Sequence, residues 1–355
     1  MADGTLSQPM RVSFVVPTFR RPDTLRSTLS ALLALDYPPG DYEVVVVDDG
    51  SDDTTGAVVT GLATTDARIR YHPQPNSGVA TARNHGAKAA SGELLIFLDD
   101  DMLVEPDHIR AHLAVREQYG DCLVNGHWVF SEATGESLRQ TPFGRYRMVL
   151  EDEIRERFAK VDIGQGRFEI TSVTAANLGV SARTFAELGG FDERFPYAGY
   201  EDQEFSYRAH EAGHRFIYDP AIRLGHNDER VTLEQFARRY QRGAVTAVYL
   251  AAMHPEEYAG SPLVLENAPP TEYDPRPLRA KKLLKRAFSA MGGLWLLRAA
   301  IGQLEHRAPQ SSLLPRLYSM TIGVFIFRGI REGLEQMPAA QAAAVAAMRD
   351  QQAHA

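Results

Sequence analysis

The chain has 355 residues, 44% of them hydrophobic, and a formal net charge of -8 at pH 7. This length suffices for one large domain or two smaller ones, and the acidic balance argues against general affinity for nucleic acid. Because the single cysteine, Cys122, can form no internal disulfide, we expect a reducing, cytoplasmic location.

No targeting or membrane-spanning segment is expected. The first ten residues are polar and contain no apolar stretch typical of a signal peptide. The longest apolar runs, at 294–301 and 317–327, are each shorter than a bilayer requires.

The first hundred residues alternate between short apolar runs and helical patterns. Continuous apolar runs indicate strands buried on both faces, and the first run is expected to stop at Pro17. The alternation predicts an α/β fold with a mostly parallel sheet flanked by helices. The strands are expected at residues 12–16, 43–47, 69–72 and 94–98.

Acidic residues follow two of these strands. Asp48 and Asp49 follow the second, and Asp99, Asp100 and Asp101 follow the fourth. Carboxylates this close repel one another in a partly dry crevice unless a cation lies among them. Since open α/β folds bind ligands at the carboxyl ends of their strands, we predict a metal site there. A solvated acidic turn is the alternative for either group taken alone.

The rest of the chain is less regular, with a long irregular excursion at 131–168 that is typical of a lid or acceptor loop. Beyond residue 231 the pattern is helical, and a Pro-rich stretch at 262–277 suits a connector. Between the fourth strand and residue 231, we expect helices at 105–120, 145–158, 182–188 and 201–213 and strands at 122–130 and 215–218. His226 comes shortly after the last of these strands.

Six motifs occur in a fixed order along the chain. They are Val16-Pro17-Thr18-Phe19, Val47-Asp48-Asp49-Gly50-Ser51, Asn76-Ser77-Gly78 with Ala82-Arg83-Asn84, Asp99-Asp100-Asp101, Gly189-Gly190-Phe191-Asp192 and Glu201-Asp202-Gln203-Glu204-Phe205. In this order they resemble the family 2 glycosyltransferases over residues 10–230. The resemblance implies a GT-A fold, which is a Rossmann-like nucleotide-binding mixed sheet flanked by helices, and inversion at the anomeric carbon.

Together with composition, the resemblance divides the chain into four parts. Residues 1–230 form the GT-A catalytic domain, with a nucleotide-sugar half at about 10–104 and an acceptor half at about 105–230. A C-terminal helical extension follows. It comprises a Pro-rich helical connector at 231–275, a basic amphipathic helical region at 276–336 and an Ala-rich tail at 337–355.

The resemblance also implies roles for individual residues. Asp202 is expected to be the catalytic base with Glu201 beside it, and the start of a helix favours an ionised carboxylate there. Asp101, Asp99 and His226 are the expected ligands of Mn²⁺ or Mg²⁺, and the imidazole favours Mn²⁺. An exposed loop histidine is the alternative for His226. The expected donor-binding residues are Pro17, Thr18, Arg20, Asp48, Asp49, Asn76, Gly78, Arg83, Asp99 and Asp100.

The predicted function is metal-dependent transfer of a sugar, most commonly from a UDP-sugar, to a glycan, a lipid-linked or a small-molecule acceptor. A non-catalytic nucleotide-sugar-binding protein is one alternative. A phosphohydrolase is less well supported because Met102-Leu103 follows the acids where Thr or Val is usual. A nucleotidyltransferase would need a Gly-rich basic loop where Pro17-Thr18-Phe19 stands.

The C-terminal region is strongly basic. Residues 276–307 contain eight Lys or Arg and one acid, Glu305, beside apolar residues that include Trp295. Such a region suits the surface of an anionic membrane, which would place the protein peripherally on the inner face. The alternative is a helical hairpin that packs on the catalytic core or on a second subunit, as in a homodimer.

Overall fold

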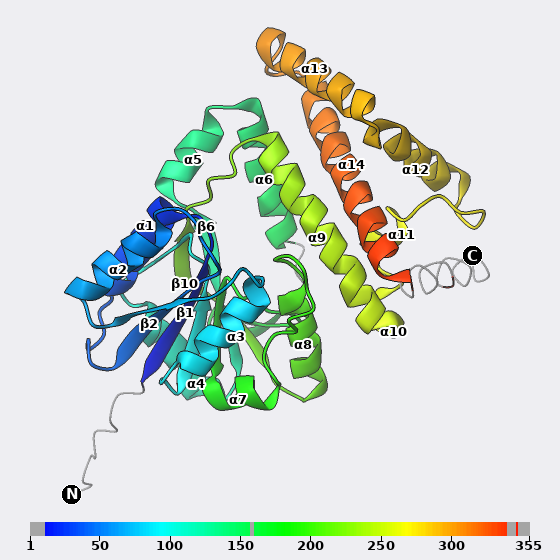
Figure 1. Cartoon of the computed structure of the whole chain (residues 1–355). Coiled ribbons are helices and arrows are strands. Elements are labelled where there is room, and N and C mark those ends of the chain that lie inside the picture. The colour runs from blue at the N-terminus through cyan, green and yellow to red at the C-terminus, as the bar shows by residue number, and fades with distance from the viewer. Residues whose placement is uncertain (1–10, 157–159, 339–345, 347–355) are drawn as a thin grey trace, which may run out of the picture. The chain divides into compact units, whose positions relative to one another are not determined.

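The computed structural model describes residues 11–156, 160–338 and 346 (Figure 1). The chain divides into two compact units. The first contains the described parts of residues 1–132, 158–194 and 202–228, and the second those of 133–157, 195–201 and 229–355. The first unit contains the sheet, and the second is built of helices.

Ten strands in the described residues of the first unit form one mixed sheet. They are β1 (Val12–Thr18), β2 (Tyr42–Asp48), β3 (Ile69–Pro73), β4 (Leu94–Leu98), β5 (Met102–Val104), β6 (Leu123–Phe130), β7 (Lys160–Gly164), β8 (Arg167–Ile170), β9 (Asn177–Ser181) and β10 (Phe216–His226). The order is β3-β2-β1-β4-β9-β6-β10-β8-β7, with β5 paired to β10. β1 to β4 are mutually parallel, whereas β9 lies antiparallel between β4 and β6.

Helices cover both faces of this sheet, which explains the continuous apolar runs. On one face, Phe14 of β1 packs in a buried cluster with Leu25 and Leu29. On the other, Val15 lies in a cluster with Phe97 and other buried apolar side chains. The helices are α1 (Pro22–Leu33), α2 (Thr55–Thr65), α3 (Val79–Ala89), α4 (His108–Tyr119), α7 (Ala182–Glu187) and α8 (Glu201–Glu211).

The expectation that the first strand stops at Pro17 was wrong. β1 continues to Thr18, and Pro17 pairs in register with Val47 of β2. On its other side, the pairing of β1 with β4 ends at Val15 and Phe97. The missing N–H of Pro17 therefore interrupts no ladder at that edge.

The last strand of the sheet is longer than expected. β10 covers Phe216–His226 rather than 215–218, with a register irregularity between Asp219 and Arg223. Pro220 lies in that interval, and because proline interrupts a ladder, the strand pattern in the sequence stops before it. His226 is thus the final residue of a strand.

The region expected to be irregular is ordered where the structure describes it. Helices α5 (Glu132–Arg139) and α6 (Pro142–Glu156) are followed by the hairpin of β7 and β8. α6 begins three residues before the helix expected at 145–158, since Pro142 suits a first helical turn. The side chains of β7 are mostly exposed, which explains why no apolar pattern marked it.

The second unit also contains α9 (Leu233–Met253), α10 (Pro255–Tyr258), α11 (Pro262–Leu265), α12 (Arg276–Ser289), α13 (Met291–Arg307) and α14 (Leu313–Gln336). Figure 1 shows α9 and α14 side by side. Glycines allow this close approach, because a Cβ at Gly333 would lie 2.8 Å from Cβ of Val248. Most of the Ala-rich tail lies outside the described residues.

Helix α14 is longer than the apolar run at 317–327, which was expected to be too short to cross a bilayer. The run at 317–327 lies within this 24-residue helix, which is long and apolar enough to cross a membrane. Half of the relevant window is buried within the protein, and Tyr318, Val324 and Phe327 are among the buried side chains. A core helix of a soluble unit satisfies the same criterion, so the length of α14 by itself is weak evidence for spanning.

Candidate metal and nucleotide-sugar site

The carboxyl ends of β1, β2 and β4 carry the predicted donor-site residues. Thr18, the last residue of β1, is in register with Asp48, the last residue of β2. The hydroxyl of Thr18 donates a hydrogen bond to Oδ2 of Asp100 at 2.7 Å. Residues from separate strand ends therefore converge at one edge of the sheet, where ligands bind in open α/β folds.

Three side chains at this edge could bind one metal ion. Ligand atoms of Asp101, His226 and Asp228 all lie within 4.8 Å of one another, and the three residues are buried. Strand pairing creates this proximity, because Met102 of β5 is the antiparallel partner of His226 of β10. The N–H of Asn227 also donates to the carbonyl oxygen of Asp101 at 2.7 Å.

The chemistry of the group suits a divalent cation. Two carboxylates and an imidazole are ligands that Mn²⁺ accepts readily. Nε2 of His226 lies 3.4 Å from Oδ2 of Asp101, while its buried Nδ1 has no hydrogen-bond partner among the described residues. His226 is 3% exposed, with the Trp128 ring 4.9 Å away, so the alternative of an exposed loop histidine was wrong.

Sequence reasoning did not identify Asp228 as a ligand, and the metal group does not include the predicted ligand Asp99. The only local signal for Asp228 was its position two residues after His226. Oδ1 of Asp99 instead accepts a hydrogen bond from Nη2 of Arg83 at 2.7 Å. Asp99 is about one-third exposed (35% of its side chain) whereas Arg83 is buried, so Asp99 can meet a ligand that enters from solvent.

Arg21 is a second site residue that the sequence did not reveal. Its Nη1 lies 2.6 Å from Oδ1 of Asp100 and 2.9 Å from Oδ2 of Asp101. Burial raises the pKa of Asp100 to about 6, and the charge of Asp101 adds to this, whereas the Arg21 guanidinium lowers it. Arg21 thus supplies positive charge to two buried acids.

Asp48 shapes the loop that follows β2. Its Oδ1 accepts the N–H of Ser51 at 2.9 Å, and its Oδ2 accepts the hydroxyl of Tyr71 at 2.8 Å. The backbone N–H of Arg20 donates to the hydroxyl oxygen of Ser51 at 2.8 Å, which links the loops after β1 and β2. The guanidinium of Arg20 lies 2.7 Å from the carboxylate of Asp52, and both side chains are exposed.

Asp49 holds the loop that leads into α3. Its two carboxylate oxygens accept the backbone N–H groups of Ser77 and Gly78 at 2.8 and 2.9 Å. The side-chain amide of Asn76 donates to the carbonyl oxygen of Asp49 at 2.8 Å. Gly78 has a φ of 94°, a conformation that favours glycine. These predicted donor-binding residues therefore form a connected loop structure.

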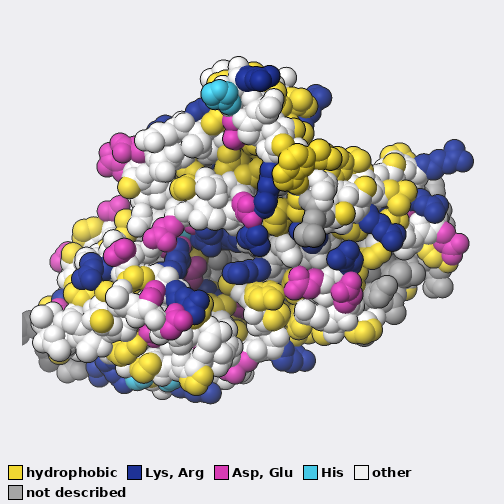
Figure 2. All heavy atoms as spheres, turned by 45° about the horizontal axis from the view of Figure 1, so that its top comes forward, with side chains coloured by type: hydrophobic (Ala, Val, Ile, Leu, Met, Phe, Trp, Pro, Cys, Tyr) yellow, Lys and Arg dark blue, Asp and Glu magenta, His cyan; other side chains and the backbone are white. Residues whose placement is uncertain are grey.

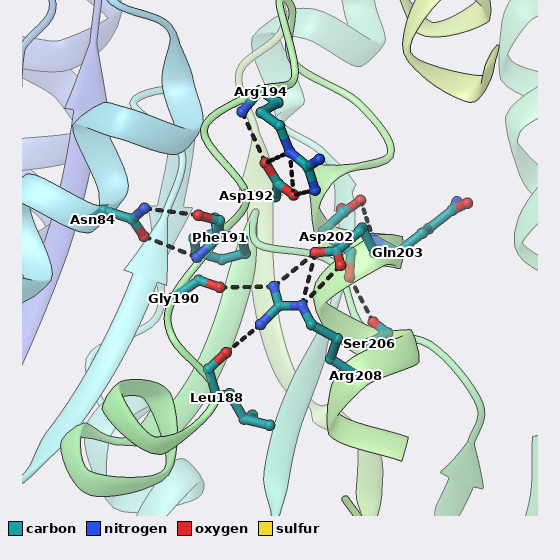
Figure 3. Close-up of polar contacts among 11 residues, drawn as sticks. Asn84, Leu188, Gly190, Phe191, Asp192, Arg194, Asp202, Gln203, Ser206 and Arg208 are labelled. Carbon is teal, nitrogen blue, oxygen red and sulfur yellow. Dashed lines mark hydrogen bonds and ion pairs between the residues drawn. The ribbon is translucent and has the colours of Figure 1, made fainter. Parts of the chain in front are cut away.

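The predicted base, Asp202, lies in the first turn of α8 (Figure 3). Its Oδ1 accepts the N–H of Gln203 at 2.9 Å, and its carbonyl oxygen accepts the hydroxyl of Ser206 at 2.7 Å. The Asp202 side chain is partly exposed. Glu201 is buried, and one of its oxygens accepts the N–H of Gly199 at 2.5 Å. Of the two acids, Asp202 is the more accessible.

The motif at 189–192 joins α3 and α8 in the first unit (Figure 3). The amide of Asn84 in α3 donates to the carbonyl oxygen of Phe191 at 2.8 Å and accepts its N–H at 2.9 Å. Arg208 of α8 donates to the carbonyl oxygen of Gly190 at 2.7 Å and lies 2.7 Å from Oε2 of Glu204. The motif thereby fixes the helix whose first turn carries Asp202.

Comparison with known proteins extends these observations. Residues 13–176 match the family described as Glycosyl transferase family 2. Validoxylamine A glucosyltransferase of Streptomyces hygroscopicus subsp. limoneus is 43% identical over 113 residues, or 31% of this chain and 25% of that protein. The GalNAc(5)-diNAcBac-PP-undecaprenol beta-1,3-glucosyltransferase of Campylobacter jejuni subsp. jejuni serotype O:2 is 32% identical over 138 residues, or 37% of this chain and 44% of that protein. The chain thus covers less than half the length of these relatives.

A solved structure shares the fold more broadly. Mannosyltransferase PcManGT from Pyrobaculum calidifontis, solved in complex with GDP-Man and Mn²⁺, has a TM-score of 0.57 at 19% identity, covering 91% of this chain and 88% of that chain. The GT-A fold implied by the sequence motifs is confirmed. The resemblance of the motifs to the family 2 glycosyltransferases is thus confirmed by the family match over residues 13–176.

Proposed function

We propose that the chain is an inverting, metal-dependent glycosyltransferase that transfers a sugar from a nucleotide diphosphate sugar to an acceptor hydroxyl. The observation that carries this proposal is the buried Asp101, His226 and Asp228 group at the edge of a GT-A sheet. These three residues would hold a divalent cation, which would supply charge neutralisation at the diphosphate leaving group. Mn²⁺ is favoured over Mg²⁺ because one donor is an imidazole.

Asp202 is proposed as the base. Inversion requires the acceptor oxygen to attack the anomeric carbon opposite the leaving group. As the new C–O bond forms and the bond to the diphosphate breaks, the carboxylate of Asp202 takes the hydroxyl proton. The amino-terminal end of α8 favours the ionised carboxylate that this step needs.

The donor and acceptor are proposed by class. A UDP-sugar is our first candidate, with GDP- and dTDP-sugars as the other donors to compare. The names of the two relatives refer to glucosyl transfer, one involving validoxylamine A and the other an undecaprenol-linked saccharide. Both a small molecule and a lipid-linked glycan are therefore reasonable acceptors for a cytoplasmic enzyme.

Two substitutions test the proposal. The assay measures the rise in melting temperature when UDP-, GDP- and dTDP-sugars are each added together with Mn²⁺. Asp101→Asn should remove most of the rise that the nucleotide sugar bound by the wild type produces. Asp202→Asn should retain that shift but lose donor turnover by about 100-fold or more. Asp36→Asn is the matched control, because its exposed carboxylate forms an ion pair with the exposed Arg110, and neither residue is an expected donor-binding residue.

The outcomes separate the two candidate functions. Mn²⁺-dependent nucleotide binding with no turnover on any acceptor class would favour a non-catalytic nucleotide-sugar-binding protein. If Asp202→Asn turns over donor at the wild-type rate, Asp202 is not the base. If no nucleotide sugar shifts the melting temperature of the wild type in the presence of Mn²⁺, the proposed function is wrong.

A further inference from the structure

Exposed apolar side chains concentrate in one short part of the sequence. Nine large hydrophobic residues are exposed among the described residues, and five of them lie between residues 283 and 313. Their exposed fractions are 48% for Leu283, 50% for Leu284, 67% for Trp295, 58% for Leu296 and 46% for Leu313. Isolated exposed residues need no explanation, but a cluster marks an interaction site.

Helix α12 has an apolar stripe flanked by cations. Ala280, Leu283, Leu284 and Ala287 recur at helical spacing and are all exposed. α12 contains no acidic residue, and its exposed basic side chains are Arg276, Arg279, Lys281 and Arg286. A helix with this pattern is typical of one that lies in a membrane interface.

Helix α13 packs one side against the core and exposes Trp295 and Leu296 outside it. Leu294, Leu297 and Ile301 are buried in a cluster with Leu314 and Tyr318 of α14. Trp295 and Leu296 are therefore not needed to fill that core. Tryptophan is enriched where apolar and aqueous phases meet.

Both helices rest on α14, so their exposed stripes face away from it. In α12, the Lys285 side chain lies 3.4 Å from the Cβ position of Gly323 in α14, and Ser289 accepts a hydrogen bond from Nε of Arg328 at 3.0 Å. Lys282 is also turned inward, where its Nζ lies 2.6 Å from Asp274. Figure 2 shows hydrophobic side chains gathered beside Lys and Arg side chains where α13 comes forward.

We propose that this surface docks on an anionic lipid membrane, with α12 and α13 lying in the plane of the interface. We define the α12–α13 surface as Leu283, Leu284, Trp295 and Leu296 with the basic residues Arg276, Arg279, Lys281 and Arg286. The inference goes beyond the proposed sugar transfer and does not depend on it.

Charge favours lipid over a second copy of the chain. The exposed basic residues of α12 are Arg276, Arg279, Lys281 and Arg286, whereas Lys282 is buried against Asp274 and adds no charge to the surface. A symmetric contact between two copies of this surface would bring like charges together, whereas anionic headgroups complement them. α14 serves as a core helix with half of its apolar window buried, so the surface indicates peripheral docking rather than insertion.

Co-sedimentation of the full chain with vesicles tests the proposal. Vesicles that contain phosphatidylglycerol should pellet the protein at low salt, pure phosphatidylcholine vesicles should not, and added salt should weaken binding. The double variant Trp295→Ala with Leu296→Ala should bind at least about tenfold more weakly. The control is Val149→Ala with Val161→Ala, since these exposed apolar residues (59% and 68%) lie outside the surface.

Fluorescence gives a second readout. The chain has two tryptophans, so Trp128→Phe leaves Trp295 as the sole reporter, which should shift to the blue and be quenched by brominated lipid. Absence of binding to anionic vesicles at low salt would overturn the proposal. The proposal would also be overturned if the wild type is a dimer that does not bind vesicles and if Trp295→Ala converts this dimer to monomers. Either result leaves Mn²⁺-dependent nucleotide binding unaffected, so the two proposals fail separately.

Discussion

Nη1 of Arg21 lies 2.9 Å from Oδ2 of Asp101, the same oxygen that Nε2 of His226 approaches at 3.4 Å. Arg21 also lies 2.6 Å from Asp100, so one guanidinium bridges two buried carboxylates. A divalent cation on Asp101 would compete with this guanidinium for one oxygen. Arg21 therefore both stabilises the acids and opposes metal binding.

Arg21→Gln should lower the free energy of unfolding without metal by about 1–3 kcal/mol, because two buried acids lose a charged partner. The same change should increase the rise in melting temperature that Mn²⁺ produces. Thermal unfolding with and without Mn²⁺ measures both effects. Arg20→Gln is the control, since its ion pair with Asp52 is exposed on both sides. Equal Mn²⁺ shifts in wild type and Arg21→Gln would rule out the competition.

Gly190→Ala should destabilise the first unit by about 2–4 kcal/mol, through backbone strain and overpacking together. Gly190 has a φ of +73°, and a Cβ there would lie 2.6 Å from Oδ1 of Asn84. Gly189→Ala is a matched control, because Gly189 has a φ of +79° but a Cβ there would meet nothing within 4 Å. Gly189→Ala should lower the free energy of unfolding by only about 1–2 kcal/mol. Urea unfolding of both variants gives the comparison, and equal losses would show that the Asn84 contact is unimportant.

Stability should fall as the pH drops from about 6.5 toward 4. Nε2 of His108 and Nε2 of His112 each lie 3.1 Å from Oδ1 of Asn177, and both rings are buried. Burial lowers the pKa of His112 to about 4 and that of His108 well below its ordinary value. In this range of pH the unfolded chain binds more protons than the folded chain. For His112 alone, the free energy of unfolding falls by about 3 kcal/mol across the range.

The histidine contribution can be isolated by substitution. Asp100, whose pKa is raised to about 6, acts in the opposite direction over part of the same window. We therefore compare urea unfolding of wild type and His112→Gln at pH 7, 6 and 5. The variant should lose less stability on acidification, and identical slopes would contradict the assignment to His112.

Asp274→Ala should lower the free energy of unfolding by about 3–5 kcal/mol, because it leaves the ammonium of Lys282 buried without the carboxylate of Asp274. The two charged atoms are 2.6 Å apart, and the side chains are 0% and 1% exposed. The neighbouring pair Lys281 and Glu266 is 55% and 48% exposed, so Glu266→Ala should cost less than about 1 kcal/mol. Urea unfolding at pH 7 compares them, and similar losses would show that burial does not govern the difference.

The features that sequence reasoning predicted have strong local patterns. β4 and residues 44–47 of β2 are uninterrupted apolar runs because both faces of the sheet are covered, and the acids after these runs therefore marked the strand ends. β5 has only three residues, too few for its apolar side chains to indicate a strand, and β7 is mostly exposed and shows no apolar pattern. The start of α7 is also fixed locally, because the hydroxyl oxygen of Ser181 accepts the N–H of Thr184.

The features that sequence reasoning missed depend on distant pairing. Asp228 joins Asp101 only because β5 pairs antiparallel with β10, and no local pattern reports that pairing. Arg21 reaches Asp100 and Asp101 from the loop before α1, a contact between distant segments. The motifs identified the family, whereas the ligand geometry required three-dimensional structure.

The place of β9 in the sheet limits how this protein can be divided. β9 begins at Asn177, directly after the family match ends, yet it lies between β4 and β6. A fragment cut at residue 176 would leave the backbone edge of β4 open to aggregation and would separate Asp101 from His226 and Asp228. Any chimera that borrows the donor-binding half must therefore carry the later segments with it, since they supply the neighbour of β4 and two of the three candidate metal ligands.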